Sequence, residues 1–146
     1  MTSSRFTVWL LLIALSGCGG KTARTTDTDS TEFATLDEKK AFLERYVNFR
    51  RTYEELEFDI TYTDGGGGRV PGPTEWDIRL AAKVPGNGLD EWIAGLETKQ
   101  GVDTTWVSRI PKAPDKLDGF EWATDGDRLV GIDPKQRLVV YWNVSR

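Results

Sequence analysis

Apolar side chains recur every three or four positions between Phe42 and Tyr53, as they do along one side of an α-helix. Charged residues fill most of the positions between them. Just before this repeat, Thr35 is followed three residues later by Glu38, which is the residue pairing of a capping box at a helix start. The pattern therefore predicts a long helix that begins after Thr35 and ends near Glu54.

Two later segments alternate apolar and polar residues, which is typical of strands with one buried face. They are residues 56–63, with the sequence LEFDITYT, and residues 76–84, with the sequence WDIRLAAKV. We expect them to pair as an antiparallel hairpin with a long loop. The polar face of this hairpin would carry cross-strand pairs of opposite charge, formed by Glu57 and Asp59 with Arg79 and Lys83.

The second half of the chain carries shorter signals. Residues 87–96 predict a short helix that covers the sheet, and residues 106–110 predict a strand that ends before two prolines. Residues 120–124 and 127–132 flank an Asp-Gly pair, which is a preferred hairpin turn. A second turn, Asp-Pro-Lys-Gln, leads into a last strand over residues 137–144.

Together these elements predict an α+β fold: an antiparallel sheet of four or five strands with one long N-terminal helix and one short helix packed on one face. A single domain would span residues 35–146. Residues 19–34 before it are rich in Thr, Asp, Ser and Gly, and bury too little apolar surface to repay ordering. We expect this segment to be a flexible tether.

The first 18 residues follow the plan of an export signal. Arg5 precedes a ten-residue apolar run, Phe6 to Leu15, which is too short to span a membrane. Leu-Ser-Gly-Cys at residues 15–18 resembles the lipobox of bacterial lipoproteins. The resemblance implies that residues 1–17 are a signal peptide cleaved between Gly17 and Cys18, with diacylglycerol on the Cys18 sulfur and acylation of the new N-terminus. Residues 18–34 would then combine a lipidated cysteine with the flexible tether. The resemblance also implies an address in the cell envelope, at the outer membrane if the host has two membranes, because Gly19 and not Asp follows.

The composition of the 146 residues disfavours several classes of partner and of catalytic site. The net charge of −4 disfavours nucleic acid as a partner, and the absence of His removes the usual general base and most zinc sites. Cys18 is the only cysteine, so lipidation would leave no thiol for redox chemistry. We expect no cofactor, no metal site and no catalytic residue, and hence no enzymatic activity.

The loop between the two alternating segments contains four successive glycines, but the prolines after them exclude the helix that a phosphate-binding loop requires. An exposed loop on a rigid sheet is instead a reasonable place for a protein contact. Its candidate contact residues are Arg69, Val70, Pro71 and Pro73. Residues 70–79 resemble segments of small uncharacterised bacterial proteins, and that resemblance carries no site.

Five tryptophans follow the signal segment. Trp76, Trp92 and Trp142 lie on the apolar phase of their own elements, so we expect them to pack in the core. Trp106 and Trp122 are the two that we interpret as candidate exposed aromatics. Exposed indole rings would favour binding of sugar rings, and the many carboxylates leave room for a glycan-cleaving pair.

The sequence therefore predicts a lipid-anchored envelope protein with a non-enzymatic domain that binds another protein, as an inhibitor or an immunity-type partner does. The partner would be an envelope or secreted protein, and the membrane contact would be made through Cys18. Two alternatives stay open: a glycan-binding or glycan-cleaving domain that acts on peptidoglycan, and a structural lipoprotein of the envelope.

Overall fold

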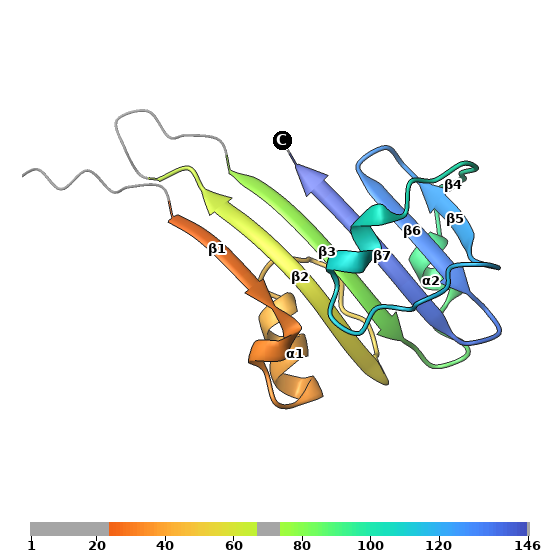
Figure 1. The fold of residues 1–146 in the computed structure, drawn as a ribbon, viewed down its shortest axis with the longest axis horizontal. Coiled ribbons are helices and arrows are strands. Elements are labelled where there is room, and N and C mark those ends of the chain that lie inside the picture. Colours follow the sequence, from red (N-terminus) through yellow and green to blue (C-terminus); the bar gives the residue numbers. More distant parts are fainter. Residues whose placement is uncertain (1–23, 67–73, 146) are drawn as a thin grey trace, which may run out of the picture.

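The computed structural model describes residues 24–66 and 74–145. They form one seven-stranded antiparallel sheet with the strand order β1-β2-β3-β7-β6-β5-β4 (Figure 1). The strands are β1 (Arg24–Asp29), β2 (Glu55–Asp64), β3 (Glu75–Lys83), β4 (Glu97–Thr98), β5 (Glu121–Thr124), β6 (Arg128–Asp133) and β7 (Leu138–Ser145).

The predicted central hairpin is confirmed. β2 pairs with β3 so that Phe58 lies opposite Leu80, and both side chains are fully buried. The alternation follows from this burial, because every second residue of a strand points to the same face. Leu56 and Ile60 join Phe58 on the buried face, while the intervening side chains point to the other face of the sheet.

The predicted C-terminal strands are also confirmed. The turn between β5 and β6 places Gly126 at φ +99°, a value that favours glycine, and Asp125 N–H donates to the carbonyl of Arg128 at 3.3 Å. In the next turn, Asp133 Oδ1 accepts from the backbone N–H groups of Lys135 and Gln136 at 2.9 and 3.2 Å. Local turn chemistry thus fixes the register of β5, β6 and β7.

The predicted fold class is wrong in its strand number and in its long helix. Seven strands replace the four or five expected, because β1 and β4 were not predicted. β1 lies inside the segment that we expected to be a flexible tether. It pairs with β2 along its whole length, and a 3₁₀ helix, η1 (Ser30–Glu32), follows directly. The tether prediction is therefore corrected for residues 24–34, and residues 18–23 lie outside the described residues.

The helix α1 (Leu36–Leu43) is much shorter than the predicted helix, which extended to residue 54. Its predicted start is confirmed: Thr35 Oγ1 accepts from Glu38 N–H at 3.2 Å, and Glu38 Oε2 accepts from Thr35 N–H at 3.0 Å. Residues 44–54 are rich in aromatic, β-branched and arginine residues, and their aromatic rings pack against the sheet in irregular backbone. Tertiary packing thus overrides the helical spacing, and the aromatic and β-branched residues of the segment lower its intrinsic helix propensity.

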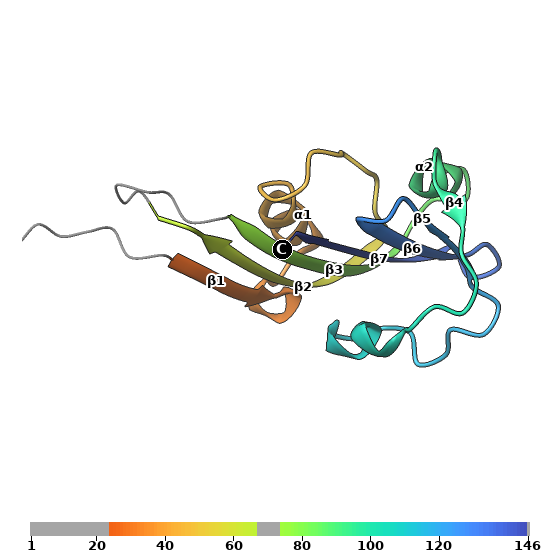
Figure 2. The same cartoon turned by 90° about the horizontal axis from the view of Figure 1, so that it is seen from above.

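Both faces of the sheet are covered, as the side view shows (Figure 2). On one face, α1 and the short helix α2 (Asp90–Ile93) pack over a core that includes Leu43, Phe58 and Trp92. On the other face lies a second core, over which the chain forms a 3₁₀ helix, η2 (Thr105–Arg109), instead of the strand predicted for residues 106–110. Trp106, Val107 and Ile110 are buried there, which is a spacing that a helical turn satisfies and a strand does not.

Candidate functional site

A groove opens on the α1 face, near the end of the sheet where β7 finishes. Its volume is about 380 Å³, within the range of binding sites for small molecules and peptide segments. The lining residues come from the segment after α1 and from β3, β6 and β7: Tyr46, Val47, Asn48, Phe49, Trp76, Ile78, Arg128, Tyr141 and Asn143.

One wall of the groove is the irregular segment after α1. The segment begins with a turn in which the N–H groups of Tyr46 and Val47 donate to the carbonyl of Leu43, at 2.9 and 3.2 Å. The Tyr46 ring lies 5.2 Å from that of Tyr62, and the Phe49 ring lies 5.5 Å from that of Tyr141. Aromatic contacts at both ends therefore hold this wall against the sheet.

The floor of the groove combines apolar surface with a fixed indole ring. Trp76 Nε1–H donates to Asn143 Oδ1, and this bond joins β3 to β7 and sets the orientation of the half-buried indole. Ile78 is buried two residues further along β3. Such an apolar floor with a few placed polar groups is the usual composition of a binding site.

Arg128 brings the positive charge of the groove. Its Nε–H donates to Asp125 Oδ2 at 2.7 Å, and Nη2 lies 2.5 Å from the same oxygen. The hydrogen bond from Arg128 lowers the pKa of the Asp125 carboxyl and raises that of the guanidinium. Burial raises the pKa of Tyr141 to about 12, so its phenol is neutral at physiological pH. The groove thus combines apolar burial, amide groups and a guanidinium that Asp125 holds in place, an arrangement that suits binding.

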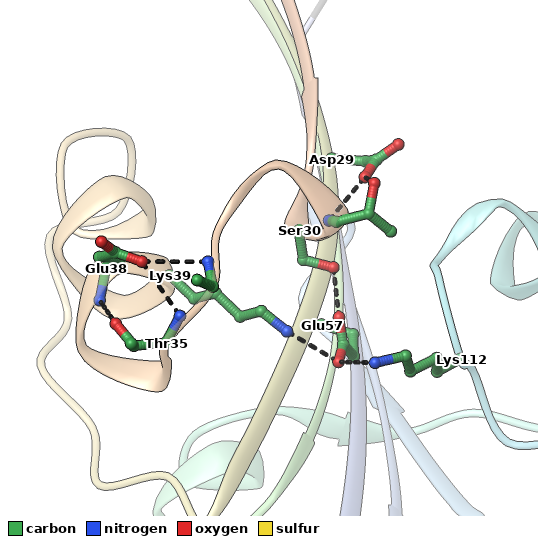
Figure 3. A network of polar contacts seen from close by, with 9 residues as sticks. Asp29, Ser30, Thr35, Glu38, Lys39, Glu57 and Lys112 are labelled. Atoms are coloured by element: carbon green, nitrogen blue, oxygen red, sulfur yellow. Dashed lines mark hydrogen bonds and ion pairs between the residues drawn. The ribbon is translucent and has the colours of Figure 1, made fainter.

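The opposite side of β2 carries a second polar arrangement, around Glu57 (Figure 3). Lys39 Nζ reaches Glu57 Oε1 at 2.8 Å, Ser30 Oγ–H donates to Oε2 at 2.5 Å, and Lys112 Nζ lies 3.7 Å away. Burial alone would raise the pKa of Glu57, but the hydrogen bonds from Lys39 and Ser30 lower it overall. Glu57 thus links α1, η1 and the chain after η2.

Arg79 lies deeper on the same face, with its side chain 7% exposed. Its Nη1–H donates to Asp59 Oδ1 at 3.1 Å, which confirms one predicted cross-strand pair, and its Nη2–H donates to Asp77. Trp142 Nε1–H donates to the second oxygen of Asp77 at 2.8 Å. The other predicted pair is corrected: Lys83 lies 3.8 Å from Glu55 and not beside Glu57. These carboxylates hold a buried guanidinium, an arrangement that serves the structure of the sheet.

The candidate exposed aromatics are not exposed. Trp106 is only 6% exposed, stacks on Trp142 at 5.6 Å and meets Trp122 edge-on at 6.4 Å. Trp122 is half-buried within the same core. These rings cover the face of the sheet opposite to the groove, so this prediction is corrected for both residues.

The remaining predicted site residues lie outside the described residues: Gly17, Cys18, Arg69, Val70, Pro71 and Pro73. Sequence reasoning missed the groove, because it assigned Tyr46 and Phe49 to a helical stripe and Trp76 to the core. The only sequence signal was their aromatic character, since residues 46–49 meet residues 141–143 only through the fold.

Among the described residues, no helix is long and apolar enough to cross a membrane. Within residues 24–66 and 74–145, no three His, Cys, Asp or Glu side chains gather as a set that could hold a metal ion. Comparison with protein-family models, with curated proteins and with solved structures found no match to this chain.

Proposed function

We propose that this chain is a lipid-anchored protein of the bacterial cell envelope whose domain binds a segment of another protein in the groove. The observation that carries the binding proposal is the lining of that groove. Trp, Tyr and Arg are the residue types that dominate binding energy at protein interfaces, and Trp76, Tyr46 and Arg128 lie together here.

The anchoring proposal is supported by the sequence of residues 1–18. An apolar run of signal-peptide length ends in Leu-Ser-Gly-Cys, and this cysteine is the only one in the chain. Two or more acyl chains at Cys18 would hold the protein on a membrane stably, whereas a single chain would bind only marginally.

Partner binding supports an inhibitor or immunity-type role better than a glycan-directed one. The glycan hypothesis depended on exposed indole rings at Trp106 and Trp122, and both rings pack into the second core. The groove, in contrast, presents a half-buried Trp76 beside the neutral phenol of Tyr141 and the cation of Arg128. An apolar segment of a partner that packs on these aromatic rings would match that chemistry.

The test compares two matched asparagine substitutions in the full chain, purified from membranes in detergent and exposed to envelope and secreted proteins of its host. Asn48→Lys places a long cation in the groove wall, and Asn87→Lys places the same cation at an exposed site before α2. We expect a protein that the native chain and Asn87→Lys both retain and that Asn48→Lys loses. With the purified partner, Kd is expected to rise about tenfold or more, equivalent to about 1.4 kcal/mol.

The binding proposal would be contradicted if all three chains retained the same proteins. It would also be contradicted if the native chain retained no protein. The anchoring proposal is tested separately by the intact mass of the chain taken from native membranes. A mass equal to residues 18–146 plus acyl chains supports it, and the mass of an unmodified chain refutes it.

A further inference from the structure

One end of the sheet gathers segments that lie far apart in the sequence. β1 begins at Arg24, which lies opposite Asp64 at the end of β2, while Ser145 near the end of β7 lies opposite Trp76 at the start of β3 (Figure 1). We call this end, defined by Arg24, Asp64, Trp76 and Ser145, the anchor end. The groove lies beside it, because Trp76 and Asn143 line the groove.

The anchor end also contains the described residue that is nearest to Cys18 in the sequence, Arg24. Five residues separate Cys18 from Arg24, the first residue of β1, so the chain takes six residue steps from one to the other. A chain of that length reaches at most about 20 Å even when fully extended. The tether predicted from the sequence would have had a contour length of about 55 Å, so pairing of β1 with β2 shortens the reach of the domain severely.

The opposite end of the sheet is held away from the anchor. β7 runs for eight residues between the two ends, a length of about 25 Å. The turn from Asp133 to Gln136 lies at that far end, just before β7 begins. A domain tied at Arg24 therefore has one end that stays near the acyl chains and another end that points away.

The side chains near the anchor end suit the lipid headgroup region. Tyr62 lies opposite Trp76 across β2 and β3, and both aromatic side chains are half-buried. Tyr and Trp, with an apolar ring and a polar N–H or O–H, are enriched where a membrane meets water. The exposed residues beside them, Asp64 and Glu75, are acidic. Electrostatic attraction to anionic lipid therefore does not contribute to this contact.

We infer that the anchor end rests on the lipid headgroups of the membrane that holds the acyl chains, with Tyr62 at the interface and Trp76 beside it in the groove. This inference rests on the lipid attachment proposed above. It deepens the proposed function, because it places the groove beside the membrane surface. The partner then presents its bound segment close to the membrane and not far out in solution.

The inference can be tested with a label at one chosen position, because Cys18 is the only cysteine of the chain. When lipid occupies the Cys18 sulfur, an introduced cysteine is the only free thiol of the chain. Thr74→Cys places that thiol at the anchor end and Lys135→Cys places it at the far end, both at exposed positions. Each full-length lipidated variant is labelled with a fluorophore and reconstituted in phosphatidylethanolamine–phosphatidylglycerol vesicles that contain a lipid with a nitroxide headgroup.

We expect the nitroxide to quench the label at position 74 several-fold more than the label at position 135. Inserting a flexible Gly-Ser segment of about 20 residues after Gly20 adds a reach of about 25 Å and is expected to abolish most of that difference. Equal quenching at the two positions, or stronger quenching at position 135, would overturn the inference. A chain that does not float with the vesicles refutes the lipid attachment and the inference with it, whereas floating with equal quenching refutes the orientation alone.

Discussion

Alanine at position 131 is expected to destabilise the fold, because the indole of Trp122 occupies the space that a Cβ would need. Gly131 lies opposite Trp122 across β5 and β6, and its Cβ would stand 2.7 Å from Cζ3 of the ring. Ordinary contacts begin at 3.4 Å, so the ring must move by about 0.7 Å. Trp106 and Phe120 lie against that ring and oppose the movement.

The expected loss of unfolding free energy is about 1–2 kcal/mol. Overpacking a core costs about 1–3 kcal/mol, and replacing a strand glycine by alanine returns about 0.5–1 kcal/mol. Urea unfolding is the assay: the midpoint should fall by about 0.5–1 M while the slope stays unchanged.

Two further variants isolate the steric cause. Gly86→Ala is the matched control, since its Cβ would find Arg137 Cδ at 3.8 Å and should change stability by less than about 0.5 kcal/mol. In a Trp122→Leu background, Gly131→Ala should cost almost nothing more, because the ring that obstructs the Cβ is gone. A Gly131→Ala chain as stable as the native chain would refute the reasoning.

Three other predictions concern the helix, Glu57 and the N-terminus. Thr35→Ala removes the hydroxyl of the capping box and should cost about 1 kcal/mol in urea unfolding, with Thr52→Ala, at an exposed site, as a near-neutral control. The lowered pKa of Glu57 means that its carboxylate stabilises the fold above the ordinary value of 4.5 and loses this effect as pH falls through the folded-state pKa. The stability difference between the native chain and Glu57→Gln should therefore shrink on acidification, and a pH-independent difference would contradict the ion-pair argument. Cys18→Ala should leave circular dichroism and unfolding unchanged but release the chain from membranes, and an unchanged membrane fraction would refute the anchoring proposal.

The strands that the sequence predicts correctly are those whose signals are local. Alternation around Phe58 and Leu80 and the turn residues at Gly126 and Asp133 act within a few residues of the strands that they specify. β1 has no such signal: Arg-Thr-Thr-Asp-Thr-Asp contains no apolar residue, and the strand exists because β2 supplies its hydrogen-bond partners. Its stabilisation comes from residues about 35 positions away, as in the pairing of Thr25 with Thr63.

The helix and the groove show the same limit. The capping box at Thr35 fixes where α1 begins, but the end of the helix depends on where Tyr46 and Phe49 find aromatic partners. The sequence pattern predicts the strands that carry those partners, Tyr62 and Tyr141, but it does not give where these strands lie relative to residues 46–49. The groove is therefore a product of tertiary packing, and its residues appear in the sequence as an ordinary apolar repeat.

The pairing of β1 with β2 has a mechanical consequence for a chain held by its N-terminus. A pull between acyl chains beyond Arg24 and a partner seated in the groove would run across the strands, because Arg24 and the groove residues Trp76 and Asn143 lie at the same end of the sheet. The hydrogen bonds from β1 to β2 lie along that direction, and all six residues of β1 are in register with β2. Such a load opens the ladder one bond after another from the Arg24–Asp64 pair, so β1 is the first strand to separate when the partner is pulled away from the membrane.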